Sequence, residues 1–385
     1  MTSGRAIVVG GGIGGLAAAL ALHRHGWRVS VLERTAEPRE IGAGLSLTAN
    51  GLRALDALDL GVAVRAHGRT DTAGGLRDRS GRWLSRVPAA ELERTLGTSA
   101  VGIHRAELHA LLRAALPADT LVTGARVTDV EPATGDVHYR AAGSAATVRG
   151  DLVVGADGLR SVLRTRLWPD LPPPLYAGST AWRAVLAWPH PLPTAVTWGP
   201  GAEFGIVPMG DGRIYWYGAV TAPPGGRDTD GRRAVLDRFG SWHDPIPALV
   251  AATPTEAVLR HDIQHLATPL PSYVRGRVAL LGDAAHAMTP NLGQGAQLAL
   301  EDAVTLGAAC ATGPAHVSSA LAAYDRQRRP RTQEVARASL RAGRYGQQLR
   351  NPLAVAARDT VLRLTPARMA LRAMARYADW TPPPA

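Results

Sequence analysis

The sequence predicts an α/β fold in which a Rossmann-like dinucleotide-binding domain is interleaved with a β-sheet domain and followed by C-terminal helices. Three observations support this prediction. An apolar N-terminal strand runs into a glycine fingerprint, two later apolar strands end in turns that pair Gly with Asp, and aromatic residues gather in an extended middle region. With 385 residues and 46% hydrophobic content, the chain is large enough for two domains.

The first predicted strand ends in a G-x-G-x-x-G motif. Gly10 permits the tight turn, Gly12 lets the backbone approach a pyrophosphate, and Gly15 lets the next helix pack on the strand. That helix is expected over 16–25 and is closed by Gly26. Its N-terminal amides and its dipole favour phosphate binding.

A second alternating strand over 28–32 delivers Glu33 at the distance beyond the glycines where an acid holds ribose hydroxyls. Together with the glycines, Glu33 predicts a dinucleotide site more strongly than the glycines alone. Helices are expected over 50–60 and 106–116, the second with Arg105 directly before it.

The segment 120–150 is expected to form two short strands joined by a hairpin. A further apolar strand starts at Asp151 and ends in a turn at Asp157 and Gly158. Three consecutive prolines at 172–174 mark a boundary.

The region from Tyr176 to Ile263 is expected to be extended β structure. Aromatic residues concentrate there, which suits a sheet that walls a ligand pocket. Tyr215 and Tyr217 share one strand face by period-two alternation, while Trp216 points to the other face.

A late strand over 277–281 and helices over 295–310 and 317–338 follow, and 339–380 has amphipathic helical spacing. The expected organisation is a discontinuous nucleotide-binding domain over 1–70, 100–175 and 265–340, a sheet domain over 71–99 and 176–264, and a helical segment over 341–385.

Composition excludes several function classes. All 43 basic residues are arginine, which excludes Schiff-base chemistry on lysine. The net charge of +11 is spread along the chain without a basic block, so no nucleic-acid partner is expected. No apolar run reaches membrane-spanning length, no signal peptide is expected, and the single Cys310 cannot form an internal disulfide, so a cytoplasmic location is expected.

Three motifs carry a resemblance to a known family. They are GGGIGG near the start, DLVVGADGLRSVLR from Asp151, and VALLGDAAHAMTPNLGQGAQLALEDA from Val278. In these motifs, and over nearly its whole length, the chain resembles the class A flavoprotein monooxygenases, the family of para-hydroxybenzoate, salicylate and urate hydroxylases. The third motif is the most specific of the three.

The resemblance implies FAD as the cofactor and NADPH or NADH as the reductant. It assigns Asp283 to the ribityl side of FAD, Asp157 to a joint FAD and nicotinamide role, and the helix start at Gly295 to the flavin pyrimidine edge, where a helix N-terminus favours negative charge. From the residues alone, both aspartates could instead be turn or helix caps. The implied cofactor residues are Gly10, Gly12, Gly14, Gly15, Glu33, Arg34, Ser46, Arg105, Val127, Asp157, Asp283, Pro290, Gly293, Gln294 and Gly295.

In this family a flavin C4a-hydroperoxide delivers one oxygen atom from molecular oxygen, so no catalytic side chain is assigned. The protein must bring an aromatic or polycyclic substrate close and exclude water, so that the substrate is hydroxylated or epoxidised. The pocket candidates are Trp182, Arg183, Trp198, Phe204, Tyr215, Tyr217, Met288, Pro290 and Asn291. Core packing is the alternative for each aromatic residue, and solvent exposure is the alternative for Arg183.

Other patterns are weaker. His261 and His265 have metal-compatible spacing but lack a convincing helix and an acidic third ligand, so no metal site is expected. His286 is expected to be structural. The arginine-rich C-terminal helix could lie on a membrane, although packing across the flavin domain is the expected use of its apolar face and no stable membrane insertion is expected.

Other flavoenzyme classes and one class without enzyme activity are the alternatives to a monooxygenase. A flavin oxidase or dehydrogenase that inserts no oxygen shares the first glycine motif but not the other two. A second nucleotide fingerprint, which Baeyer–Villiger and N-hydroxylating flavoenzymes carry, fails in the stretch 199–204, and a halogenase needs a pocket lysine. The remaining alternative is an arginine-rich nucleic-acid or membrane-surface module. A monomer or homodimer is expected.

Overall fold

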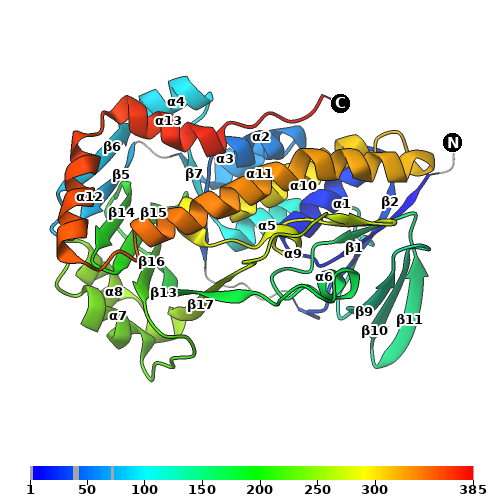
Figure 1. The fold of residues 1–385 in the computed structure, drawn as a ribbon, viewed down its shortest axis with the longest axis horizontal. Helices are drawn as coiled ribbons and strands as arrows, with labels where there is room; N and C mark the ends of the chain where they lie inside the picture. The colour runs from blue at the N-terminus through cyan, green and yellow to red at the C-terminus, as the bar shows by residue number, and fades with distance from the viewer. Residues whose placement is uncertain (1–2, 38–42, 71–72, 385) are drawn as a thin grey trace.

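The computed structural model describes residues 3–37, 43–70 and 73–384 and has the predicted α/β fold (Figure 1). One of its two large sheets is six-stranded, in the order β18-β19-β12-β1-β2-β8. Strands β19, β12, β1 and β2 run parallel, so their carboxyl ends lie at one edge of the sheet. The bounds are β1 (Arg5–Val9), β2 (Arg28–Leu32), β8 (Leu121–Val122), β12 (Leu152–Gly155), β18 (Val274–Arg275) and β19 (Val278–Leu280).

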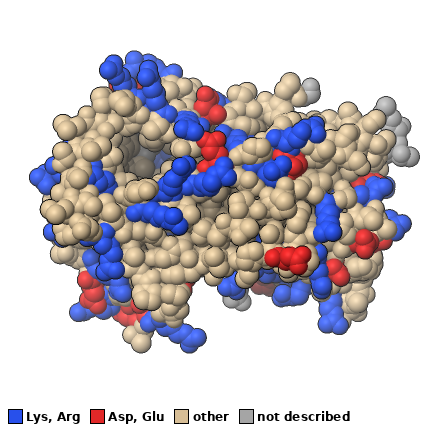
Figure 2. All heavy atoms as spheres, in the orientation of Figure 1, with Lys and Arg blue, Asp and Glu red and all other residues tan. Residues whose placement is uncertain are grey.

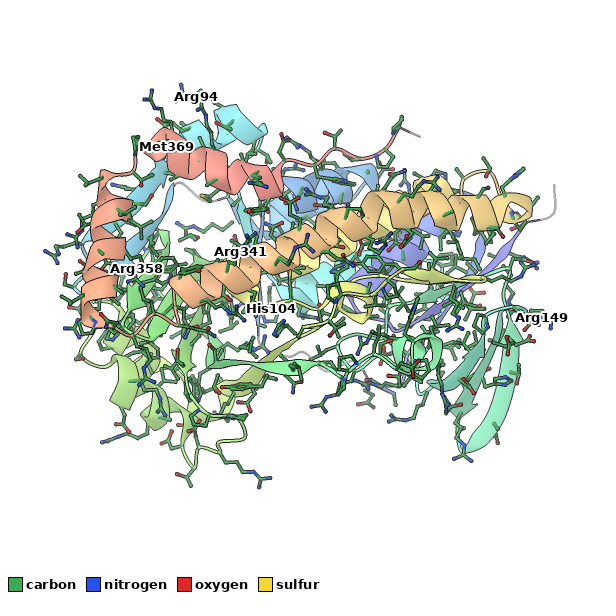
Figure 3. All side chains as sticks on the ribbon, in the orientation of Figure 1. Arg94, His104, Arg149, Arg341, Arg358 and Met369 are labelled. Carbon is green, nitrogen blue, oxygen red and sulfur yellow. The ribbon has the colours of Figure 1, made fainter. Side chains whose placement is uncertain are left out.

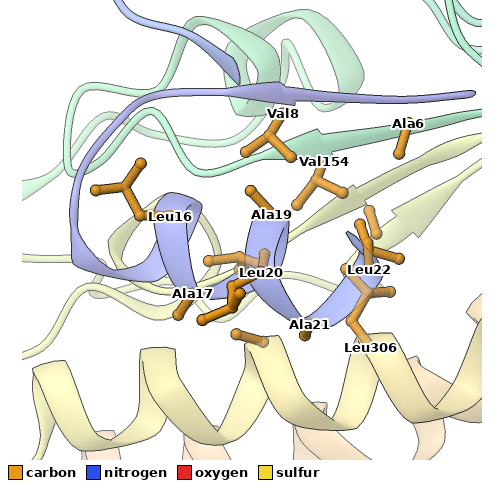
Figure 4. Packing of buried hydrophobic residues seen from close by; sticks show 14 of the residues in the cluster. Ala6, Val8, Leu16, Ala17, Ala19, Leu20, Ala21, Leu22, Val154 and Leu306 are labelled. Carbon is orange, nitrogen blue, oxygen red and sulfur yellow. The ribbon is translucent and has the colours of Figure 1, made fainter. Parts of the chain in front are cut away.

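Helix α1 (Ile13–Arg24) lies between this sheet and α10 (Gly295–Ala309) (Figure 4). Small residues bring the two helices close: a Cβ built on Gly14 would lie 3.2 Å from Ala299 Cβ, and one on Gly307 would lie 2.7 Å from Ala21 Cβ. Because the pairs advance together along both helices, α1 and α10 are parallel. Their N-termini therefore point to the same side of the molecule.

A seven-stranded sheet in the order β17-β13-β16-β15-β14-β5-β6 lies toward the other end of the molecule (Figure 1). Its strands are β5 (Ala73–Asp78), β6 (Trp83–Pro88), β13 (Leu175–Ala187), β14 (Thr194–Gly199), β15 (Ala202–Pro208), β16 (Arg213–Thr221) and β17 (Leu259–His265). They are antiparallel except for the β14–β5 pair. The sheet therefore draws its strands from two separate parts of the chain.

The expectation of extended structure throughout 176–263 is wrong in one part. Helices α7 (Gly231–Phe239) and α8 (Ile246–Ala252) interrupt it and cover one face of the seven-stranded sheet. Their buried residues Val235 and Phe239 are four apart, which is helical rather than strand spacing.

Helix α11 (Val317–Tyr345) crosses the molecule in Figure 1 and continues beyond the predicted end at 338. It is followed by α12 (Pro352–Leu364) and α13 (Ala367–Ala378) at the edge of the sheet domain. None of the helices in the described ranges has the length and apolar character needed to cross a bilayer.

The remaining elements lie around these two sheets or connect them. The segment 120–150 contributes three antiparallel strands to a separate sheet, where two were expected, because the chain turns back once more after the hairpin. The other bounds are β3 (Gly44–Leu47), β4 (Arg69–Thr70), β7 (Val101–His104), β9 (Arg126–Glu131), β10 (Asp136–Ala141), β11 (Ser144–Arg149), α2 (Ala49–Ala57), α3 (Gly61–His67), α4 (Ala89–Leu96), α5 (Arg105–Ala114), α6 (Val162–Leu167), α9 (Asp283–His286) and η2 (Pro290–Leu292).

Candidate active site

The three sequence motifs meet at the carboxyl edge of the six-stranded sheet. The turn after β1 contacts the turn after β12, because a Cβ on Gly10 would lie 2.4 Å from the Ala156 carbonyl oxygen. The turn after β12 joins the third motif through a hydrogen bond of 3.0 Å from the Leu281 amide to the Gly155 carbonyl. Segments far apart in sequence thus form one continuous surface.

The glycine turn divides into packing positions and one open position. Gly10 has φ +105°, and a Cβ on Gly15 would lie 1.9 Å from the Gly10 carbonyl oxygen. A Cβ on Gly14 would lie 2.9 Å from Leu281 Cδ1, so this glycine packs against the third motif. At Gly12 nothing lies within 4 Å, and it precedes α1 without a side-chain cap. The free amides of α1 therefore face open space that suits an anion.

Glu33 follows β2 and is held by its own loop. Its Oε2 accepts a hydrogen bond of 2.7 Å from the Gly11 amide, and its Oε1 accepts one of 2.8 Å from the Thr35 amide. Burial raises the pKa of this carboxyl, but the amide hydrogen bonds outweigh burial and the net pKa is lowered. The ionised carboxylate retains lone pairs for ribose hydroxyls.

Three other predicted cofactor residues lie around this edge. Arg34 is exposed beside Glu33, and Ser46 on β3 accepts a hydrogen bond of 2.7 Å at its carbonyl from Gln297 Nε2. Val127 on β9 is a buried member of the main core, so its side chain packs inward.

Asp157 caps the start of helix α6, which is one of the two roles that its sequence allowed. One of its carboxylate oxygens also remains without a partner among the residues that the structure describes. Its Oδ2 accepts hydrogen bonds from the amides of Val162 at 2.7 Å and Leu163 at 3.2 Å. Its Oδ1 is buried without a partner, and burial raises the pKa of the carboxyl. Arg164 on α6 reaches the Ala284 carbonyl at 3.0 Å and so ties the second motif to the third.

Asp283 and Arg105 face the same open space. Gly282 has φ +57° and directs the chain into α9, leaving Asp283 exposed. Arg105 is also exposed, yet surrounding protein lowers its guanidinium pKa; Asp283 opposes that shift and Arg183 adds to it. These charge interactions place Arg105 close to both Asp283 and Arg183, and we call the space that the exposed Arg105 and Asp283 face the interdomain recess. Arg183 comes from the sheet domain, so this recess lies between the two domains.

The start of α10 completes the flavin-domain side. Gly293 has φ +63°, and Gly295 has nothing within 4 Å of a built Cβ. Gln294 is buried, and its Oε1 accepts a hydrogen bond of 2.8 Å from Asn50 Nδ2. The helix has no side-chain cap, so its first amides are available to a ligand. Pro290, one turn earlier, is exposed.

A buried charge network supports the third motif from behind. Asp302 accepts hydrogen bonds from the Gly282 amide at 3.0 Å and Arg328 Nε at 2.7 Å, and it lies 2.6 Å from His286 Nε2. Glu301 pairs with Arg328 at 2.7 Å. Burial raises the pKa of Asp302, but the charges of His286 and Arg328 outweigh burial and lower it to about 2. The network fixes the turn that presents Asp283.

The two faces of the seven-stranded sheet have different surroundings. Trp182 and Phe204 lie on the face that α7 and α8 cover, where Phe204 stacks on Trp216 with 5.4 Å between ring centroids. Both residues are fully buried in this core. Their position contradicts the prediction that they line the pocket. Period-two alternation assigns each strand two faces but does not say which face the helices cover.

The opposite face turns toward the flavin domain. Tyr215 contacts β3, since a Cβ on Gly44 would lie 2.4 Å from Tyr215 Cβ. Tyr217 lies beside it, with 6.0 Å between the ring centroids, and the register pairs Tyr217 with Arg183. Burial raises the pKa of Tyr215, and Arg183, in hydrogen-bonding contact with the phenol, opposes the shift. The prediction that both tyrosines share a face opposite to Trp216 is confirmed.

Glu203 lies on the same face and was absent from the sequence predictions. Its neighbour across the strand pair is Trp198, whose Nε1 donates a hydrogen bond of 3.1 Å to Glu203 Oε2. Burial raises the pKa of Glu203 to about 7 despite this hydrogen bond. Tyr217 is also close, because the Glu203 charge contributes to its raised pKa. The face thus combines aromatic rings with one acid and one arginine.

The comparisons with known proteins decide the family. A family model described as an FAD binding domain matches residues 4–339. The chain belongs to the class A FAD-dependent aromatic monooxygenases. It is 39% identical over 362 residues to the aurachin C monooxygenase/isomerase of Stigmatella aurantiaca, covering 93% of each chain, and 35% identical over 374 residues to the 2-heptyl-3-hydroxy-4(1H)-quinolone synthase of Pseudomonas aeruginosa, covering 94% of each.

A solved structure of a similar protein has the same fold as this monooxygenase. The crystal structure of Klebsiella pneumoniae HpxO complexed with FAD and uric acid matches with a TM-score of 0.89 and 30% identity, over 97% of this chain and 96% of the other. The match covers both the flavin-domain edge and the sheet domain described above. The predicted enzyme class and FAD as the cofactor are confirmed.

The residues of the monooxygenase fit FAD at the motif edge. The orphaned Asp157 Oδ1 is an acceptor that needs a donor such as a ligand hydroxyl. The side chain of Asp283 makes no hydrogen bond within the described residues and has only charge interactions with Arg105 and Arg164. The open space at Gly12 and the uncapped starts of α1 and α10 add anion-binding amides.

The remaining predicted pocket residues are placed as follows. Met288 and Asn291 are half-buried, and Asn291 lies against Gly343 of α11, where a built Cβ would be 2.7 Å from its Oδ1. His261 and His265 lie on strand β17, and no group of three potential metal ligands occurs in the described ranges. Sequence reasoning missed Glu203 and the Asp302 network. The acidic pair at 301–302 inside the third motif was the available signal for the network.

Proposed function

We propose that this monooxygenase hydroxylates or epoxidises an aromatic bicyclic compound, with NADPH or NADH as the reductant. The observation that carries the proposal is the sheet face on which Tyr215, Tyr217 and Arg183 oppose Asp283 and Arg105 across the interdomain recess. The relative named for a heptyl quinolone, which matches with 94% coverage, supports a bicyclic substrate that carries an apolar chain. We also propose that it works in the cytoplasm as a monomer or homodimer.

Bound FAD supplies the redox chemistry, by accepting hydride from the nicotinamide and activating oxygen for transfer of one atom to the substrate. The chain's own residues bind and orient the substrate. The rings of Tyr215 and Tyr217 offer faces and edges to an aromatic substrate. Arg183 can hold an anionic or carbonyl oxygen on the ring, and Glu203 can exchange a hydrogen bond with a ring N–H or hydroxyl.

Residues 3–37, 43–70 and 73–384 form no separate domain for the reductant. The one nucleotide fingerprint at Gly10–Gly15 belongs to the FAD edge, so the nicotinamide would bind transiently beside it. The raised pKa and the orphaned oxygen of Asp157 lie at this edge, which supports its shared role with FAD and nicotinamide.

The test is oxygen-dependent NAD(P)H oxidation by the flavin-loaded enzyme with a panel that includes 2-alkyl-4-quinolones, urate and aminohydroxybenzoates, with product masses recorded. A quinolone-stimulated rate with a gain of one oxygen atom supports the proposal. Turnover that yields only hydrogen peroxide with every compound would favour the oxidase alternative. Stimulation by urate alone would refute a substrate that carries an apolar chain.

A further inference from the structure

The C-terminal helices present apolar side chains to solvent. Ten large hydrophobic side chains are exposed among the described residues, and five of them lie on α12 and α13. On α12, Leu353, Val361 and Leu364 are 82%, 64% and 77% exposed, and their spacing of eight and three places them on one helix face. Met369 at the start of α13 is 55% exposed. Scattered surface leucines need no explanation, but a helix face of them does.

Two arginines lie beside Met369 at the start of α13. Arg368 and Arg372 on α13 are exposed, and neither has a carboxylate partner in the described part of the chain. Figure 2 shows basic side chains gathered over the corner that α4 and α13 form, and Figure 3 labels Arg94 close to Met369 there. We call Leu353, Val361, Leu364 and Met369 with Arg368 and Arg372 the elbow patch.

Carboxylates are nearly absent from the same helices. Asp359 is buried and pairs with Arg358 at 2.7 Å, and Asp379 pairs with Arg53 at 2.9 Å. The neighbouring helix α4 carries Glu91, which is half-buried, and Glu93, which is exposed, and Glu334 of α11 pairs with Arg376 of α13 at 2.6 Å. The patch therefore keeps an excess of positive charge.

We propose that the elbow patch docks on an anionic lipid bilayer, with α12 and α13 lying at the interface. Leucine, valine and methionine beside arginine is the composition of interfacial helices, whose apolar face enters the headgroup region while the arginines meet lipid phosphates. A second copy of this chain fits less well, because two patches would bring unpaired arginines together in a protein of net charge +11. A nucleic acid would leave the apolar side chains unused.

The patch is connected to the substrate face. Arg358 of α12 lies over the ring of Trp198 at 5.0 Å and donates a hydrogen bond of 2.7 Å to the Gly346 carbonyl at the end of α11. Trp198 is the partner of Glu203 on the recess side of the sheet. Figure 2 also shows a deep hollow in the surface beside these helices. Docking would thus place the substrate face next to the membrane, where a substrate with an apolar chain collects. Only this consequence rests on the proposed function.

The experiment is co-sedimentation of the FAD-loaded enzyme with vesicles of phosphatidylcholine alone and of phosphatidylcholine mixed with phosphatidylglycerol. We expect binding to the mixed vesicles, weakened by salt, and at least about tenfold less binding to phosphatidylcholine alone. The double variant Leu364→Glu/Met369→Glu should lose about tenfold or more in partitioning. Val62→Glu on α3 is the matched control, because Val62 is 84% exposed outside the patch. It should bind as the unchanged enzyme does.

Arg368→Gln/Arg372→Gln tests the charge component separately and should reduce binding to mixed vesicles by about tenfold. The proposal is overturned if the unchanged enzyme stays in the supernatant with mixed vesicles, or if Leu364→Glu/Met369→Glu binds them as Val62→Glu does. It is also overturned if sedimentation without lipid shows a dimer that only the patch variant dissociates. FAD absorbance and NAD(P)H oxidation without vesicles, recorded on each sample, report failure of the proposed function independently.

Discussion

The flavin-domain edge and the substrate face of the sheet are built by different means. At the edge, the groups available to a ligand are backbone amides at uncapped helix starts and glycines with open space around them, as at Gly12 and Gly295. On the sheet, contacts come from side chains whose neighbours are set by strand register, as for Tyr217 and Glu203. Short motifs therefore specify the cofactor side, whereas the substrate side depends on pairings across distant strands.

The largest expected effect is on folding. It distinguishes a glycine that is needed for packing from one that is needed for FAD binding, both in the turn after β1. Gly15→Ala should prevent folding of the flavin domain, because its Cβ would lie 1.9 Å from a backbone oxygen. Gly12→Ala should leave the apoprotein's thermal transition within a few degrees of the unchanged value but weaken FAD binding about a hundredfold, because only the ligand occupies that space. Thermal unfolding measures the stability of each variant, and titration with FAD measures its affinity. Equal unfolding temperatures for the two variants would contradict the prediction.

The second largest effect should distinguish the two faces of the seven-stranded sheet. Phe204→Ala should lower the free energy of unfolding by about 3–5 kcal/mol, because it opens a cavity beside Trp216 and Phe239. Tyr217→Phe should change it by less than about 1 kcal/mol and instead raise KM or the fraction of NAD(P)H oxidised without product. Urea denaturation and product yield per NAD(P)H decide between them. A stable Phe204→Ala variant with altered substrate selectivity would restore Phe204 to the pocket.

The convergence of the three motifs was more predictable from the sequence than the choice of which sheet face is core. The motif residues follow strands by a fixed number of positions, so their convergence follows from parallel strand order alone. Trp182 and Phe204 could not be separated from Tyr215 and Tyr217 by aromatic character, since helices α7 and α8 decide which face is core. Glu203 was missed because its burial arises from the strand pairing with Trp198, which no local pattern reveals.

Glu203 should make the stability of the sheet domain depend on pH. Its pKa is raised to about 7 in the folded chain from an ordinary 4.5, so between these values the folded state holds a proton that the unfolded state has lost. Stability should therefore fall as pH rises through this window, by about 3 kcal/mol in total. Glu203→Gln keeps an acceptor for Trp198 and should flatten this slope. Apoprotein unfolding measured from pH 5 to 8 tests this, and a slope unchanged in the variant would assign the effect to another group.

The smallest expected effect is at the cofactor edge. It should appear in FAD affinity, whereas the effect of Phe204→Ala should appear in the free energy of unfolding. Asp283→Ala should weaken FAD binding by about 1–2 kcal/mol, roughly tenfold, through the loss of one acceptor for a ligand hydroxyl. The apoprotein should unfold as before, because this exposed side chain makes no hydrogen bond within the described residues. Asp283→Asn keeps an acceptor oxygen and should recover part of the affinity. If Asp283→Ala retained FAD normally while losing stability, the residue would be a structural cap, and the cofactor edge would depend on side-chain packing as the sheet does.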